Sequence, residues 1–143
     1  MKVLEINNLC KKYPTFTLDN VSFSFELGYI MGFIGRNGAG KTTTLKSMLN
    51  FVHPDSGTVS ICGYDTKKDE FLVKNNIGFV SGLDGFYNSK KIKTVTNVTK
   101  RFFKNWDENL YKELLQKFNL DENKLISSLS AGMKVKYQIA LAM

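Results

Sequence analysis

Short stretches of alternating or continuous hydrophobic residues dominate the first 82 residues and predict β-strands. Residues 3–6 form one such stretch, and across 21–27 apolar residues alternate with polar ones, which is the period of a half-buried strand. Residues 29–34 are almost continuously apolar, as in a strand that is buried on both faces. Two further stretches, 58–62 and 77–80, complete the expected strands.

Helical periodicity appears directly after residue 40 and again beyond residue 85. In the first region the apolar residues at helical spacing are Leu45, Met48, Leu49 and Val52. In the second region one helical face carries Val95, Val98 and Phe102. Asp107 is placed to cap a further helix, whose apolar residues are Leu110, Tyr111, Leu114, Leu115 and Phe118. Residues 130–143 predict a last helix, and we expect most of these apolar side chains in the core or at a subdomain interface.

The order of these elements predicts an α/β core with a helical lobe. At 143 residues the chain is long enough for one domain with its own hydrophobic core. We expect a single domain over residues 1–143. Within it, residues 1–82 would form a β subdomain and the core around the glycine-rich loop, and 83–143 a helical subdomain.

The composition is that of an ordinary globular protein, with 43% hydrophobic and 23% charged residues. No segment approaches the roughly 20 consecutive apolar residues that span a membrane. The N-terminus lacks the features of a signal peptide, so we expect a cytosolic location. Cys10 and Cys62 lie far apart, without the spacing of a metal site, and are expected to be reduced thiols.

A formal net charge of +7 bears on binding partners rather than on fold. A basic surface suits nucleic acid, an anionic membrane face or nucleotide phosphates. The basic residues are spread along the chain, apart from the run Lys90, Lys91 and Lys93. We interpret this run as a solvated loop and expect no nucleic-acid partner.

The segment Gly35-Arg36-Asn37-Gly38-Ala39-Gly40-Lys41-Thr42 matches the phosphate-loop (Walker A) pattern G-x4-GK-[ST], between a predicted strand and a helix. Glycine permits backbone angles that a Cβ forbids, so successive N–H groups can turn inward and form an anion site with the helix N-terminus. Lys41 is expected to reach the β- and γ-phosphates of a nucleotide. Thr42 is expected to ligate Mg²⁺ through its hydroxyl, and Thr43 is a candidate for an α-phosphate contact.

A second motif, Leu129-Ser130-Ala131-Gly132-Met133, opens the last predicted helix. A serine in this place can simply be the helix N-cap. Together with the phosphate loop upstream, however, the pentapeptide resembles the signature of ATP-binding-cassette (ABC) ATPases, usually written LSGGQ. In that family the signature contacts a nucleotide that the partner subunit holds.

The resemblance to ABC ATPases covers essentially the whole chain. Residues 9–13 resemble the family's A-loop, which makes Tyr13 the candidate for stacking on adenine. Residues 105–107 and the lysine-rich last helix resemble bacterial exporter-type ATPases, notably the group associated with antibiotics and envelope stress. The remaining stretches that carry the resemblance are 18–28 and 54–63.

The resemblance implies a RecA-like P-loop NTPase core with an N-terminal antiparallel β subdomain and a helical signature subdomain, incomplete at its C-terminus. The family's Walker B Asp, its adjoining catalytic Glu and its switch His have no counterpart here, and His53 lies too far upstream. In the family, two ATPase subunits pair head to tail around ATP and Mg²⁺ and drive a transmembrane permease subunit at the inner face of the cell membrane. By itself, this chain is expected to bind ATP without hydrolysing it.

Two motif positions depart from the family's pattern. Gly82 stands where family members carry the Q-loop Gln that senses Mg²⁺ and the attacking water, and it can supply only its backbone. The signature ends in Met133 instead of Gln and has Ala131 in place of the first glycine. Ser130 and Gly132 keep the hydroxyl and the close backbone approach that face phosphate.

Two alternative functions stay open at this point. A soluble ABC protein acting on ribosomes or DNA would carry tandem cassettes or a coiled-coil insertion, and the short region 85–124 does not resemble such an insertion. A non-hydrolysing nucleotide-binding fragment could be told apart only by assay. A small-molecule kinase would leave the signature and Tyr13 unexplained.

Overall fold

The computed structural model describes residues 2–81 and 87–143. It divides the chain into two compact units, Met1–Asn76 and Ile77–Met143, which are considered one at a time. The predicted Q-loop position, Gly82, lies outside the described residues. Within the described residues, no helix combines the length and the apolar character needed to cross a membrane.

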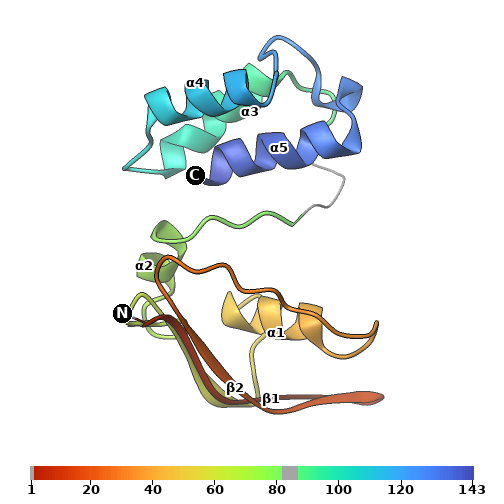
Figure 1. Cartoon of the computed structure of the whole chain (residues 1–143), viewed down its shortest axis with the longest axis vertical. Coiled ribbons are helices and arrows are strands. Elements are labelled where there is room, and N and C mark those ends of the chain that lie inside the picture. Colours follow the sequence, from red (N-terminus) through yellow and green to blue (C-terminus); the bar gives the residue numbers. More distant parts are fainter. Residues whose placement is uncertain (1, 82–86) are drawn as a thin grey trace. The chain divides into compact units, whose positions relative to one another are not determined.

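The first unit is built on a four-stranded antiparallel sheet (Figure 1). Its strands are β1 (Lys2–Tyr13), β2 (Phe16–Glu26), β3 (Ser56–Ile61) and β4 (Tyr64–Asp65), in the order β2-β1-β3-β4. The N-terminal antiparallel sheet that the resemblance implied is therefore present. Two helices, α1 (Lys41–Met48) and α2 (Glu70–Asn75), accompany the sheet in this unit.

The buried residues of the sheet follow the alternation read from the sequence. Along much of each strand the more buried side chains alternate with more exposed ones, as the two-residue period of a strand requires. The buried apolar residues of this unit are Leu4, Ile6, Leu9, Leu18, Val59, Ile61 and Val73.

The predicted buried strand at residues 29–34 is wrong for this structure. The segment has no assigned secondary structure, and Ile30 and Ile34 are 101% and 96% exposed. A strand exists only through hydrogen bonds to neighbouring strands, and none of the described strands pairs with this segment. Its apolar composition predicts that the segment is buried, but no described strand pairs with it to bury it.

The helix after the phosphate loop forms, but its most buried residues are two polar ones and not the predicted apolar ones, of which Met48, Leu49 and Val52 are half-buried. Thr44 and Ser47 are the buried residues of α1, each 1% exposed, whereas Leu45 is 43% exposed. The Thr44 hydroxyl donates to the Gly40 carbonyl at 3.0 Å. The buried Ser47 Oγ has no hydrogen-bond partner among the described residues.

The second unit is helical. It contains α3 (Ile92–Thr99), η1 (Lys100–Phe102), α4 (Glu108–Lys117), η2 (Ile126–Ser128) and α5 (Ala131–Ala142), shown in cyan to blue in Figure 1. The predicted cap of α4 is confirmed, because the Asp107 carboxylate accepts the N–H groups of Asn109 and Leu110 at 2.9 and 3.0 Å. The core of the unit contains Ile92, Val95, Tyr111, Leu114, Leu115, Leu120, Ile126, Leu129, Tyr137 and Ala140.

Two apolar predictions fail in this unit. Residues 77–80 are not a strand, because no described strand pairs with them. The predicted apolar face of α3 is also displaced: Val98 and Phe102 are 53% and 75% exposed, and the helix buries Ile92, Val95 and Thr96 instead. Burial of Thr96 is tolerated because its hydroxyl has partners.

A buried chain of hydroxyl groups joins α3, α4 and α5. Thr96 Oγ1 lies 2.7 Å from Tyr111 Oη and 3.0 Å from Tyr137 Oη, and Tyr137 Oη donates to the Ile92 carbonyl at 3.2 Å. Burial raises the pKa of Tyr111, and it raises the pKa of Tyr137 to about 12. These hydrogen bonds therefore hold the three helices in one register, and both phenols stay neutral at physiological pH.

Replacing Ser47 by Ala should stabilise the protein by about 1 kcal/mol. The substitution removes a buried hydroxyl that has no described partner and introduces the best helix former. Chemical denaturation of the full chain measures the change in unfolding free energy. The matched control is Thr44→Val, which removes an equally buried but hydrogen-bonded hydroxyl and should destabilise the chain. Equal effects of the two substitutions would contradict this reading.

Tyr137→Phe should lower the unfolding free energy at neutral pH by about 1–2 kcal/mol, because Thr96 and the Ile92 carbonyl lose a partner. An unfolded tyrosine ionises near pH 10, whereas folded Tyr137 ionises near 12. The stability that this group contributes is therefore complete below pH 10 and is lost as the pH rises toward 12.

Denaturation of the wild-type chain should consequently show stability falling over this alkaline range, with a shallower fall in Tyr137→Phe. The exposed Tyr29 provides the control, since Tyr29→Phe should leave both the neutral-pH stability and the slope unchanged. An identical alkaline slope in wild type and Tyr137→Phe would show that this phenol is not the titrating group.

Candidate nucleotide-binding site

The phosphate loop, residues 35–40, lies between the extended segment 29–34 and the first residue of α1. The backbone N–H of Ala39 bonds to the Arg36 carbonyl at 3.2 Å, which closes a turn within the loop. Gly35 to Ala39 are exposed, and Gly40 is half-buried. The residues that the sequence assigns to phosphate binding are thus presented together on a turn at a helix N-terminus.

Lys41 folds back across the loop that precedes it. Its ammonium donates to the carbonyl of Gly35 at 2.5 Å and to the carbonyl of Arg36 at 2.7 Å. These two residues begin the loop, whereas Lys41 begins α1, so the side chain spans the loop from one end to the other. An anion bound by the loop would meet a full positive charge in addition to backbone dipoles.

Gly40 closes the loop in a conformation that no other residue accommodates here. Its φ of +90° is left-handed, and a Cβ on it would lie 2.8 Å from Phe16 Cζ and 2.9 Å from Leu18 Cδ1. The loop therefore packs directly on β2. As the N-cap of α1, Gly40 offers no side chain to the first N–H groups of the helix, and the first turn carries no acidic residue. Those N–H groups and the helix dipole favour an anionic ligand.

Three consecutive threonines follow Lys41 and differ in exposure. Thr42 is exposed, Thr43 is half-buried and Thr44 is buried against Gly40. The exposed hydroxyl of Thr42, one residue after the lysine, is a hard oxygen of the kind that Mg²⁺ takes. The chemistry and placement of these residues fit a nucleotide phosphate with its metal ion.

Tyr13, the predicted adenine platform, lies at the end of β1 and is 36% exposed. Across the hairpin it pairs with Phe16, and the two rings stack at a centroid distance of 6.4 Å with an interplanar angle of 29°. Because Phe16 also abuts Gly40, the aromatic pair and the phosphate loop form one contiguous surface in the first unit.

The sequence patterns did not identify Phe16 as a site residue, although the turn beside it indicates that it faces Tyr13. Tyr13, Pro14, Thr15 and Phe16 form a two-residue hairpin turn, and in such a turn the residues on either side face each other. Recognising the hairpin would have placed the two rings together. Their contact with Gly40 depends on tertiary packing and has no local signal.

The signature residues 129–133 belong to the second unit. Ser130 is the N-cap of α5, and its hydroxyl accepts the Met133 N–H at 3.2 Å. Leu129 is buried in the core, and Met133, where the family has Gln, packs partly buried against it. Ser130, Ala131 and Gly132 are exposed, and a Cβ built on Gly132 would meet nothing within 4 Å. Packing among the described residues therefore does not require a glycine at 132.

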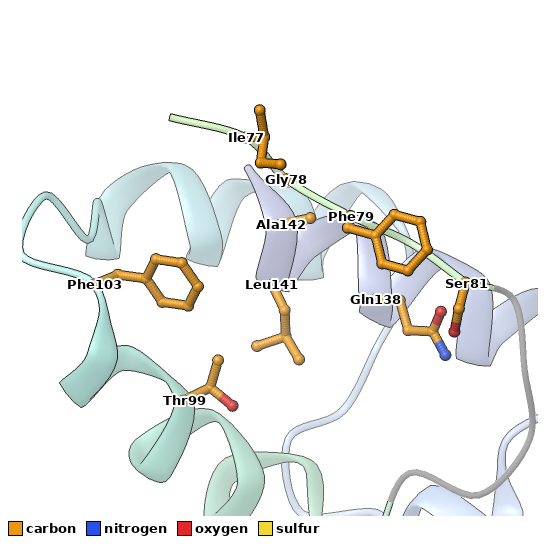
Figure 2. A pocket seen from close by; sticks show the side chains of 9 residues that line it. All are labelled: Ile77, Gly78, Phe79, Ser81, Thr99, Phe103, Gln138, Leu141 and Ala142. Atoms are coloured by element: carbon orange, nitrogen blue, oxygen red, sulfur yellow. The ribbon is translucent and has the colours of Figure 1, made fainter. Parts of the chain in front are cut away.

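A cavity of about 250 Å³ lies within the second unit, and none of the described site residues is among the residues that line it (Figure 2). Gly78 closes one side of it and sits tightly against α5, because a Cβ there would lie 2.2 Å from the Ala142 carbonyl oxygen. The residues that line the cavity are Ile77, Gly78, Phe79, Ser81, Thr99, Phe103, Gln138, Leu141 and Ala142. Its lining is predominantly apolar and lacks an ionisable group among the residues named, which suits packing better than phosphate chemistry.

Comparison with known proteins gives a consistent family. Residues 18–143 match the family model described as ABC transporter. The chain is 33% identical to the ABC transporter ATP-binding protein YtrB of Bacillus subtilis (strain 168), covering 98% of this chain and 48% of that protein. It is 30% identical to the bacitracin transport ATP-binding protein BcrA of Bacillus licheniformis, covering 99% and 47%.

A solved structure, described as the structure of an ATP binding subunit of an ABC transporter, superposes with a TM-score of 0.85 at 26% identity. The match covers 98% of this chain and 61% of that one. The chain spans about half the length of the curated relatives it matches. By the match of residues 18–143 to the family model and by these relatives, the chain belongs to the ABC transporter family.

Proposed function

We propose that this chain is the ATP-binding part of an ABC transporter and that it couples ATP to transport through a separate transmembrane permease subunit. The observation that carries the proposal is the phosphate loop. An uncapped helix N-terminus, a lysine folded across the loop and an exposed aromatic ring share one surface in the first unit. That surface offers partners for both the phosphates and the base of one nucleotide.

Each site residue takes a role that its placement supports. The N–H groups of residues 35–43 and the Lys41 ammonium would hold the phosphates, and Thr42 would ligate Mg²⁺. Tyr13 would stack on adenine. When bound, the metal ion would neutralise phosphate charge. The protein's own contribution is to orient the triphosphate on preformed dipoles.

The signature supports pairing with a second ATPase subunit. Gly132 is exposed, and packing among the described residues does not need a glycine at this position. We therefore assign the absence of a side chain here to close contact with a nucleotide on the partner. A head-to-tail pair of this kind would sit at the inner face of the membrane through the permease. The 30% identity to a bacitracin transport ATP-binding protein supports placement near the antibiotic-associated group that the sequence resembles.

Hydrolysis requires groups that we do not assign to this chain. No residue of the 143 corresponds to the family's Walker B Asp and Glu, and Gly82 would supply only its backbone at the Q-loop. We expect the chain alone to bind Mg-ATP and not to turn it over. Steady phosphate release that disappears in Lys41→Ala would contradict this expectation.

The exposed apolar segments support a larger core than the described one. Residues 29–34 have the composition of a buried strand, and Ile30 and Ile34 are almost fully exposed. We propose that these residues belong to the interior of a RecA-like sheet, which strands outside the described residues would complete in the working protein. On this view residues 1–82 contribute the β subdomain and P-loop core, and 83–143 the helical subdomain.

Lys41→Ala should weaken Mg-ATP binding at least about tenfold, because the side-chain cation that spans the loop is removed. Isothermal calorimetry on the full chain measures the dissociation constant. Lys46→Ala is the matched control, since Lys46 is a lysine in the last turn of the same helix. Equal affinities for wild type and Lys41→Ala would remove the basis of the proposed function.

Gly132→Asp should abolish ATP-dependent self-association while leaving the fold intact. An acidic residue in the first turn of α5 is favourable for the helix, and none of the described residues outside this turn lies within 4 Å of the new Cβ. At a nucleotide held by a partner, however, its charge would repel phosphate. Sedimentation velocity with and without Mg-ATP measures association, with Gly132→Ala as the uncharged control. Normal association of Gly132→Asp would show that the signature does not face the partner's nucleotide.

A further inference from the structure

Asp55 reaches from the start of β3 to the end of β1. Its carboxylate accepts from Lys11 Nζ at 2.8 Å through Oδ1 and from the backbone N–H of Lys12 at 2.7 Å through Oδ2. Its own N–H donates to the Cys10 carbonyl at 2.9 Å. A single aspartate thus contacts three consecutive residues of the strand that leads to Tyr13.

These contacts lie where the backbone ladder stops. The pairing of β1 with β3 ends at Cys10 and Ser56, so beyond this point the end of β1 pairs only with β2. Asp55 supplies the missing partner for Lys12 on that open edge. Its own position is fixed by Gly57, where a Cβ would lie 2.4 Å from the Asn8 carbonyl oxygen, so that the start of β3 lies close against β1.

The Asp55–Lys11 ion pair lies beside the Tyr13 ring. Lys11 Nζ lies over this ring, 5.9 Å from its centroid, and is held there by Asp55. Phe16 stacks on the same ring from the other strand of the hairpin and abuts the phosphate loop at Gly40. The orientation of Tyr13 relative to the phosphate loop is therefore set by neighbours on two strands.

We propose that Asp55 is a positioning residue for base recognition: through Lys11 and the Lys12 backbone it holds the Tyr13 ring in the orientation that stacks on the base. This assignment rests on the proposed function, in which Tyr13 is the adenine platform. A ring already held in place loses less conformational freedom when a base binds, so the effect is on the affinity for the base and not on the phosphates.

The charge state of the aspartate suits this role. The hydrogen bonds from Lys11 and from the Lys12 backbone lower the pKa of Asp55, so it is ionised at neutral pH. The carboxylate is about half exposed, and an exposed ion pair of this kind contributes little to overall stability. Substitution of Asp55 should thus leave the fold standing, which makes the proposal testable.

The test compares Mg-ATP with inorganic triphosphate, which has no base, by calorimetry on the full chain. Asp55→Ala should raise the dissociation constant for Mg-ATP about fivefold and leave that for Mg-triphosphate unchanged. The dissociation constant of Asp55→Asn for Mg-ATP should lie between those of wild type and Asp55→Ala. The amide oxygen can still accept the Lys12 N–H, but the neutral amide cannot form an ion pair with Lys11. In a Tyr13→Trp chain, the emission change on adding Mg-ATP should also shrink when Asp55 is replaced by Ala.

Asp65→Ala is the matched control. Asp65 also accepts hydrogen bonds from two consecutive lysine residues, in its case from their backbone N–H groups at 2.8 and 3.1 Å, but in the turn after β4. It should leave the affinities for both ligands unchanged. Equal weakening of both ligands by Asp55→Ala would show a merely structural role and overturn the assignment, as would an unchanged affinity for Mg-ATP. Failure of the wild-type chain to bind either ligand would instead overturn the proposed function, and this assignment with it.

Discussion

The phosphate loop packs on the sheet through Gly40, and the geometry of the candidate site depends on this contact. A left-handed backbone angle and the rings and methyl groups of β2 leave no room for a Cβ at this position. Because the loop can approach that closely, the N-terminus of α1 lies beside the β1–β2 hairpin. The same contact brings Phe16, and through it Tyr13, against the loop. The residues proposed to bind the phosphates and the base thus lie on a single surface.

The second unit is organised by a different kind of interaction. Three buried hydroxyl groups from α3, α4 and α5 bond to one another and to a backbone carbonyl in the middle of an apolar core. Buried polar groups are tolerated only when they are satisfied, so this chain of bonds restricts how the helices can pack. It also anchors α5 through Tyr137, and α5 begins at the exposed residues of the signature. A rigid helix therefore presents Ser130 and Gly132 to solvent.

Electrostatics and packing act together at the base platform. Isolated surface ion pairs contribute little to stability, but Asp55 and Lys11 border an exposed aromatic ring and an unpaired strand edge. Their effect is local order and not global stability. Gly132 also contributes little to the fold. A glycine within a helix lowers the stability of that helix, and no close packing among the described residues requires one here. Asp55, Lys11 and Gly132 therefore contribute little to stability, and the proposed function gives a reason for each of them.

The local features of this protein could be predicted from residue types alone. The phosphate loop, the cap at Asp107 and the helix that begins after Ser130 follow from residue types at fixed offsets, since glycine angles and capping bonds act within a few residues. The features that need distant partners could not be predicted in this way. Residues 29–34 and 77–80 are apolar enough for strands but find no strand to pair with among the described residues. The contacts between Phe16 and Gly40 and between Asp55 and Lys11 join parts of the chain that no local pattern connects. Hydrogen-bond pairing and close packing depend on what lies alongside a segment, and that is decided when the chain folds.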